Sequence, residues 1–214
     1  MSRSSFVKTF ITTALLASAF SANAALLTDT NSVFGSFDAS FGTRILNLGS
    51  GGLVSDVNIS ITFAKCDDPS IGINGIACIG TGSSFNREIV FRLTNPFGTT
   101  VNLVNQDTYS GSTPGTGRQT VTFDNEAANI IGGSSVVSGT FRPEGDLSVF
   151  DGLDAAGDWT LYIEDTVSAD RLDFFSATLN VTTRDGGDVP EPGSLALLGL
   201  GIAGLGLSKK RRQS

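Results

Sequence analysis

Several short stretches of this chain alternate apolar and polar residues one for one. A period of two is that of a β-strand with one face in a core and one in water, whereas a helix repeats every ~3.6 residues. The apolar positions are Val57, Ile59, Ile61 and Phe63; Ile89, Phe91 and Leu93; Trp159, Leu161 and Ile163; and Phe175, Ala177, Leu179 and Val181. We therefore expect an all-β fold, an antiparallel sandwich of two sheets.

Turn sequences separate these stretches. Asn95-Pro96-Phe97-Gly98 predicts a reversal between the stretch at 89–93 and another at 101–104, and residues 111–117 predict a longer loop. Trp159 could offer a stacking surface to a sugar. Its place in an alternating stretch favours the core instead.

The N-terminus, residues 1–24, has the three parts of a secretory signal peptide. Arg3 and Lys8 precede an apolar segment at 10–20, and Ala22-Asn23-Ala24 is a cleavage sequence of the A-x-A type. We expect a signal helix that is removed before Ala25, and an exported mature protein.

The two cysteines of the chain are Cys66 and Cys78. In an exported protein a single disulfide is the expected pairing, because the compartment is oxidising. The alternative is a metal site that combines the two thiolates with carboxylates, which is an uncommon ligand set for zinc.

The part of the chain between the terminal segments is strongly acidic. From residue 29 to residue 191 it holds eight Lys and Arg residues and 21 Asp and Glu residues, a net charge of −13. Such a surface repels nucleic acid and favours neutral, basic or cationic partners. Calcium is a possible cofactor, held by Asp151, Asp154 and Asp158, since these acids lie close together with glycines between them. The alternative is that they are ordinary turn residues.

The sequence contains no histidine. A nucleophile activated by histidine is thereby excluded, and we expect no enzyme and no catalytic residues. Two carboxylates could still form an acid/base pair. The candidates are Asp165 beside Asp170 or Asp173, and Asp151 with Asp154 and Asp158. Because acids at the edge of an acidic domain are usually solvated, we expect these residues to lie in solvated loops.

The last segment, residues 186–214, has three parts. Pro190, Glu191 and Pro192 precede an apolar run at 195–207, and the basic stop Lys209, Lys210, Arg211 and Arg212 follows. The run spans roughly 20 Å as a helix, short of the roughly 30 Å hydrocarbon core of a bilayer. With its flanking residues and snorkelling basic side chains it predicts a short membrane helix whose basic end stays cytoplasmic.

This tail resembles the PEP-CTERM sorting signal of Gram-negative bacteria. The resemblance implies an inner-membrane-anchored precursor that an exosortase recognises near Pro190, Glu191 and Pro192. It also implies processing and transfer to the cell surface or extracellular matrix, often alongside exopolysaccharide production. The alternative is a plain C-terminal anchor, which has no need of two prolines framing a glutamate.

Four segments between the terminal signals resemble, in order, the P domain of proprotein convertases. They are LTNPFGTTVNL at 93–103, VTFDNEA at 121–127, GTFRPEGDLS at 139–148 and GDWTLYIED at 157–165. The resemblance covers residues 54–183 and implies a jelly-roll β-sandwich, which we place at residues 25–185. Residues 169–173 depart from the glycine-bearing stretch of the family, and the loop from Cys66 to Cys78 looks like an insertion.

Together these features predict a non-catalytic, exported surface or matrix protein that is sorted by an exosortase-type system. Its sandwich is expected to interact with exopolysaccharide or a secreted protein. The alternative, suggested by the P-domain resemblance alone, is an accessory module of an exported hydrolase acting in trans.

Overall fold

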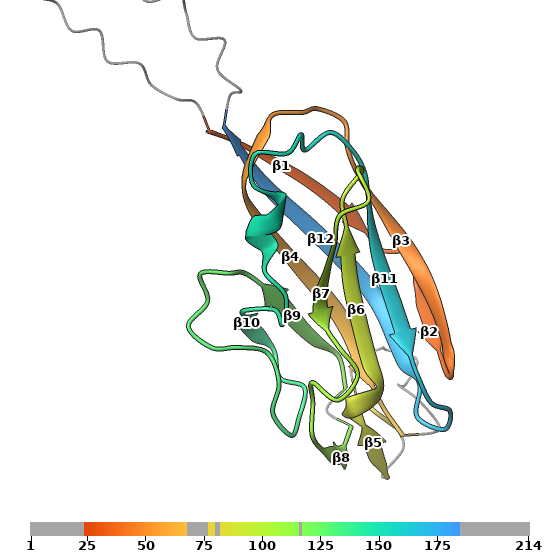
Figure 1. Ribbon diagram of the computed structural model, residues 1–214. Coiled ribbons are helices and arrows are strands. Elements are labelled where there is room, and N and C mark those ends of the chain that lie inside the picture. The colour runs from red at the N-terminus through yellow and green to blue at the C-terminus, as the bar shows by residue number, and fades with distance from the viewer. Residues whose placement is uncertain (1–23, 68–76, 80–81, 116, 185–214) are drawn as a thin grey trace, which may run out of the picture.

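The computed structural model describes residues 24–67, 77–79, 82–115 and 117–184, which form a β-sandwich (Figure 1). The expected signal helix and the tail with Pro190, Glu191, Pro192 and the basic stop lie outside the described residues. Within the described ranges, no helix is long and apolar enough to cross a membrane.

Two main sheets form the layers of the sandwich. Sheet A has the order β1 (Ala24–Asn31), β12 (Leu172–Arg184), β4 (Leu53–Lys65), β9 (Gln119–Phe123) and β10 (Gly139–Phe141), and β2 (Gly35–Phe37) also pairs with β12. Sheet B has the order β3 (Ser40–Leu48), β11 (Gly157–Asp165), β6 (Ile89–Thr94) and β7 (Thr100–Val104). A separate pair joins β5 (Ser83–Phe85) to β8 (Ser112–Pro114), and the 3-10 turns are η1 (Asn86–Glu88) and η2 (Leu147–Phe150).

The expectation of an all-β sandwich is confirmed, but among the described strands one pair is not antiparallel. Strands β9 and β10 run parallel, with Val121 opposite Gly139 and Phe123 opposite Phe141. A tight hairpin would reverse the chain, but residues 124–138 form a longer connection that brings it back in the same direction.

The core lies between the two sheets, where the alternating apolar residues meet. Ile59, Ile61 and Phe63 of β4 are fully buried, as are Trp159 and the other inward residues of β11. Across the sheets the Phe63 ring lies edge-on to the Phe91 ring, with centroids 4.9 Å apart. Trp159 is a core residue as expected, and its indole nitrogen donates to the carbonyl oxygen of Ala155 at 2.9 Å.

In strand β12 the inward-facing residues differ at one position from the alternation expected for Phe175, Ala177, Leu179 and Val181. Phe174 is fully buried, whereas Phe175 is only partly buried and lies on the opposite side. The register with β4 shifts between Phe174 and Ser176, so a β-bulge inserts Phe175 and changes which side chains face the core. Ala177, Leu179 and Val181 then face inward as predicted.

The predicted turn at 95–98 connects β6 to β7. The Asn95 side-chain oxygen accepts hydrogen bonds from the main-chain nitrogens of Phe97 and Thr99, at 3.1 and 2.8 Å. Gly98 has a φ of 86°, a left-handed conformation that favours glycine. The first and last strands also pair, with Ala24 opposite Arg184, so the two ends of the sandwich chain lie side by side (Figure 1).

Candidate functional site

A row of side chains crosses the outer face of sheet B. Tyr162 on β11 lies opposite Thr43 on β3 and Arg92 on β6, and Arg92 lies opposite Asn102 on β7. The Phe41 ring stacks on the Tyr162 ring with centroids 5.5 Å apart. The guanidinium carbon of Arg92 lies 5.0 Å from the centroid of the Tyr162 ring. We call Phe41, Tyr162, Arg92 and Asn102 the sheet B row.

Phe41 and Asn102 of the row are exposed to solvent, while Tyr162 and Arg92 are partly buried. At 67%, Phe41 is the most exposed large hydrophobic side chain among the described residues. Because Leu161 and Ile163 point into the core, the alternation of β11 places Tyr162 on the outer face. The stacked pair and the cation–π contact each contribute only about 0.5–1 kcal/mol at a surface. These contacts therefore contribute little to the stability of the fold.

A groove lies next to the row, at the edge of β7. One cavity of about 330 Å³ is lined by Thr99, Thr100, Val101, Asn102, Asn105, Glu144, Gly145, Asp146 and Val149. A second cavity, of about 380 Å³, shares Glu144, Gly145 and Asp146 and adds Asn125, Ile130, Arg142 and Pro143. We call the two cavities together the Glu144 groove. Asn102 belongs both to the row and to the groove, so the two features are continuous.

Gly145 lets the groove segment approach β7 closely. Its main-chain nitrogen donates to the Asn102 carbonyl oxygen at 2.8 Å. A Cβ at this position would lie 2.8 Å from Cγ1 of Val101, so any larger residue would push the segment away from the strand.

The two acidic side chains of the groove are held in place by hydrogen bonds. Glu144 accepts from the side chains of Asn105 and Thr108. Asp146 accepts from the main-chain nitrogen of Ser148 at 2.9 Å and from the side-chain amide of Asn125 at 2.7 Å. Hydrogen bonds from Ser148, then from Asn125, hold the pKa of Asp146 below its ordinary value. The groove therefore presents acidic acceptors that are held in place by hydrogen bonds.

One residue of this site could have been noticed in the sequence, although the alternating pattern alone did not mark it as functional. Tyr162 is an aromatic residue at a polar position of an alternating strand, between Leu161 and Ile163. Its partners Phe41 and Arg92 come from strands far apart in the sequence, so only the register of sheet B brings them together.

A second unusual site is a buried charged cluster at the opposite end of β4 and β12 from Ala24 and Arg184. The Lys65 ammonium lies 3.0 Å from the Glu88 carboxylate, 2.7 Å from Asp165 and 3.2 Å from Asp170. It also donates to the main-chain carbonyl of Asp170. All four residues are at most 6% exposed. We call them the Lys65 cluster.

Burial and pairing change the proton affinities in this cluster. Desolvation raises the pKa of Asp165 to about 7, although Lys65 opposes the shift. Desolvation likewise raises the pKa of Glu88. Desolvation opposes the charge of Lys65, but the neighbouring carboxylates of Asp165, Asp170 and Glu88 outweigh it and raise the pKa of Lys65.

The expectation that Asp165, Asp170 and Asp173 lie in solvated loops is wrong. Asp165 is fully buried, and Asp170 and Asp173 are 2% exposed. Asp165 ends strand β11 beside the core, and the ammonium of Lys65 compensates its charge and that of Asp170.

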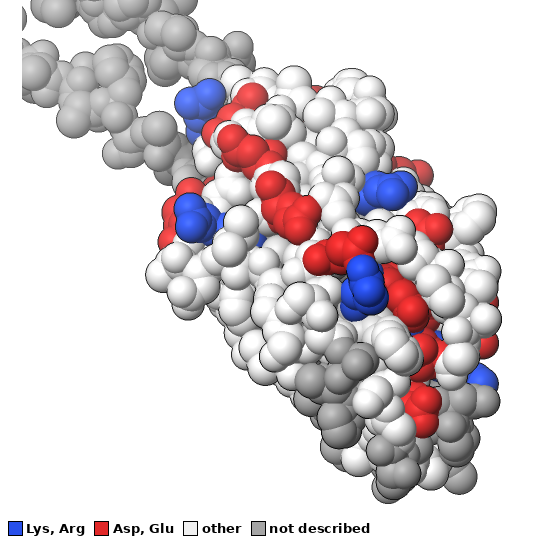
Figure 2. Space-filling view, turned by 60° about the horizontal axis from the view of Figure 1, so that its bottom comes forward, with Lys and Arg blue, Asp and Glu red and all other residues white. Residues whose placement is uncertain are grey.

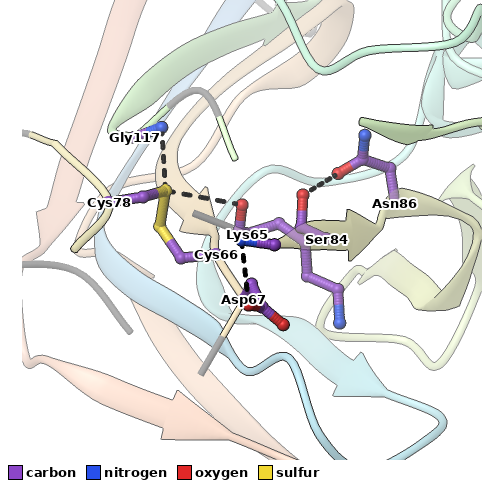
Figure 3. Close-up of a disulfide and its surroundings, with 8 residues drawn as sticks. Lys65, Cys66, Asp67, Cys78, Ser84, Asn86 and Gly117 are labelled. Atoms are coloured by element: carbon purple, nitrogen blue, oxygen red, sulfur yellow. Dashed lines mark hydrogen bonds between the residues drawn. A yellow bond between two sulfur atoms is a disulfide. The ribbon is translucent and has the colours of Figure 1, made fainter. Parts of the chain in front are cut away.

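The predicted disulfide is confirmed. Cys66 and Cys78 are bonded, with their Cα atoms 5.5 Å apart. Figure 3 shows Lys65 and Gly117 beside the bridge. The main-chain nitrogen of Gly117 donates to Cys78 Sγ at 3.2 Å, and the same sulfur lies 3.9 Å from the Lys65 carbonyl oxygen. The bridge therefore ties down the chain directly after the Lys65 cluster.

We expect reduction of the Cys66–Cys78 bridge to destabilise the protein without changing its strand content. The bridge closes a loop with a sequence separation of 12, for which loop-closure entropy predicts a loss of about 3 kcal/mol. Thermal melts followed by circular dichroism, with and without reductant, would measure it. Two free thiols in the purified protein would show that the bridge does not form.

Two of the three candidate calcium ligands, Asp154 and Asp158, accept hydrogen bonds from different partners. One Asp154 oxygen accepts from the main-chain nitrogens of Ala156 and Gly52, at 3.0 and 3.4 Å. Asp158 accepts from the Asn47 side chain at 2.6 Å. Within the described ranges, no three Asp, Glu, Cys or His side chains are grouped as metal ligands. Asp151, Asp154 and Asp158 are thus not brought together, and calcium binding stays a prediction.

Acidic side chains are prominent on the surface. Figure 2 shows a face on which Asp and Glu are more frequent than Lys and Arg. This agrees with the net charge of −13 between residues 29 and 191, and it disfavours polyanionic ligands.

Comparison with protein families identifies the tail. The PEP-CTERM protein-sorting motif matches residues 188–212, which confirms the resemblance drawn from the sequence. Proteins with this motif are exported, processed by an exosortase and sorted to the cell surface. The match covers the sorting segment and not the sandwich. No curated protein matches the chain.

Solved structures resemble the sandwich at low sequence identity. The serine protease of Aeromonas sobria, in complex with the chaperone ORF2, is 13% identical with a TM-score of 0.45, over 77% of this chain and 28% of the protease chain. The FLHE structure is 12% identical with a TM-score of 0.39, over 76% of this chain and 99% of that chain. This chain thus spans less than a third of the protease. The P-domain resemblance and the jelly-roll topology stay predictions.

Proposed function

We propose that the protein is a non-catalytic surface protein whose sandwich binds neutral exopolysaccharide along the sheet B row and the Glu144 groove. The observation that carries this proposal is the stack of the exposed Phe41 on the partly buried Tyr162 and Arg92, which continues through Asn102 into a polar groove. The PEP-CTERM motif supports it, because the surface to which such proteins are sorted is where a secreted polysaccharide is met.

The chemistry of the row fits a sugar chain. Aromatic rings offer an apolar face to the C–H side of a sugar ring while leaving the hydroxyl groups free. Asn102 and Asn105 offer amide donors and acceptors to those hydroxyls, and Glu144 and Asp146 offer acceptors. Four strands at a spacing of about 4.8 Å give a row roughly 14 Å long, so several sugar rings can be contacted at once.

The charge of the domain selects among polysaccharides. At a net charge of −13 the exported part repels a polyanion. Arg92 in the row and Arg142 in the groove are offset by the groove acids Glu144 and Asp146. A neutral polysaccharide is therefore the expected ligand class.

We expect Phe41→Ala combined with Tyr162→Ala to weaken polysaccharide binding about tenfold or more, since roughly 1.4 kcal/mol of stacking is lost. Electrophoresis through gels that contain the neutral polysaccharide of the producing strain would measure the retardation.

A matched control is a second aromatic pair, the exposed Phe34 and the partly buried Phe175, whose ring centroids are 5.6 Å apart. Phe175 lies on sheet A, so Phe34→Ala should leave the retardation unchanged. Equal retardation of the double variant and the parent, or binding to acidic polysaccharide alone, would contradict the proposal.

A further inference from the structure

The Lys65 cluster brings an amine and a carboxyl group together in a buried site. We propose that Lys65 and Asp165 condense to form an isopeptide bond, an amide between Nζ of Lys65 and Cγ of Asp165, which crosslinks the two sheets. This inference is independent of polysaccharide binding.

The geometry places the two groups in contact. Nζ of Lys65 lies 2.7 Å from Oδ2 of Asp165, and neither side chain is more than 1% exposed. Lys65 is the last residue of β4 in sheet A, and Asp165 is the last residue of β11 in sheet B. Groups held in this way react as if at an effective concentration of about 10⁵–10⁸ M. Such a concentration offsets the disadvantage of forming an amide in the presence of water.

The backbone around both groups is fixed. Lys65 pairs with Leu172 on β12, and the disulfided Cys66 follows it directly. Asp165 pairs with Ser40 on β3 and with Ile89 on β6. Lys65 is therefore held by strand pairing on one side and Asp165 by strand pairing on both sides.

Glu88 provides the proton transfer that the reaction needs. Its carboxylate oxygen lies 3.0 Å from Nζ and accepts a proton from the ammonium. The Nζ lone pair then attacks Cγ of the protonated Asp165 carboxyl, the N–C bond forms, and the C–O bond to the hydroxyl breaks. The proton held by Glu88 passes to the leaving hydroxyl, and Glu88 then takes up the second proton that Nζ loses as the amide forms. One water molecule is released, Glu88 ends protonated, and no oxidant or nucleotide is consumed.

The surroundings favour the neutral product. Burial brings the pKa of Asp165 to about 7, so the protonated carboxyl exists near neutral pH. Condensation replaces a buried ammonium and a buried carboxyl group by an amide, which removes the desolvation cost of the charged pair.

Asp165 is the better partner of the two aspartates. Asp170 is farther from Nζ, at 3.2 Å, and its Oδ2 also accepts a hydrogen bond from the main-chain nitrogen of Phe85. Its main-chain carbonyl accepts a hydrogen bond from Nζ and so orients the amine toward Asp165.

Peptide mapping tests the bond directly. Protein purified from the producing strain, as the cell processes it, is reduced, alkylated, digested with trypsin and analysed by tandem mass spectrometry. We expect a branched peptide that joins the segment containing Lys65 to the segment containing Asp165, lighter than their sum by one water molecule. We also expect no cleavage after Lys65, because trypsin needs its free side chain.

Two variants distinguish a reaction that depends on Glu88 and burial from one that needs only a lysine close to an aspartate. Glu88→Gln should slow formation by about 100-fold or more, because it removes the proton acceptor. Circular dichroism would verify that this near-isosteric variant keeps its fold. Arg87→Lys is the matched control, since it creates a lysine beside Asp107 in a pair whose side chains are 58% and 57% exposed. That solvated pair should stay uncondensed.

A branched peptide at Lys65 and Asp165 that is depleted in Glu88→Gln would support the proposal. Free Lys65 in the folded parent protein would overturn it, and so would a branch to Asp170 or Glu88.

Discussion

The Lys65→Met variant is expected to be destabilised by about 3–5 kcal/mol, because removal of one partner from a buried charged cluster leaves the others uncompensated. Methionine is similar to lysine in length, so the cavity contribution is small. The variant leaves Glu88, Asp165 and Asp170 in a site where each is at most 6% exposed. The same substitution would also remove the proposed crosslink, which acts in the same direction. Urea denaturation of the parent and the variant would measure the difference.

The control for this experiment is the exposed ion pair of Arg87 and Asp107, in which Nη2 of Arg87 lies 2.6 Å from Oδ1 of Asp107. Arg87→Met should cost less than about 1 kcal/mol, because a surface ion pair is screened by solvent. If Lys65→Met lowered the free energy of unfolding as little as Arg87→Met, this would show that the buried cluster does not form in solution.

A second large effect, the loss of processing, is expected from substitutions in the C-terminal tail. Replacement of Pro190, Glu191 and Pro192 by alanine should leave export intact, since the N-terminal signal acts separately, but should abolish processing. The full-length protein would then stay in the inner membrane through its apolar segment at 195–207. Fractionation of the cells followed by immunoblotting would show an unprocessed membrane form in place of the surface form.

Asp185→Ala, just outside the matched residues 188–212, is the matched control and should be processed like the parent. The sorting account fails if the triple variant reaches the surface in the same processed form as the parent.

The fold was predictable where local chemistry decides the structure. Val57, Ile59 and Ile61 alternate with polar residues, and this pattern alone places them in a strand with one buried face. The turn at 95–98 follows from the φ freedom of glycine and the hydrogen-bonding side chain of asparagine. The disulfide could be predicted because the chain has only two cysteines and is expected in an oxidising compartment.

The features that were not predictable depend on pairing over long distances. Lys65 and Asp165 are 100 residues apart, and an isolated lysine at the end of an alternating stretch looks like a solvated residue. The bulge at Phe175 depends on the register between β12 and β4. The sheet B row likewise exists only because β11 lies between β3 and β6.

The proposed function is that sorting delivers a polysaccharide-binding sandwich to the cell surface. Its most direct test is the location of the Phe41→Ala, Tyr162→Ala double variant in the producing strain, compared with the parent and with Phe34→Ala. We predict that the parent and Phe34→Ala are found in the exopolysaccharide fraction, while the double variant is processed normally but is recovered free in the medium. Recovery of the double variant in the exopolysaccharide fraction, in the same amount as the parent, would contradict the account.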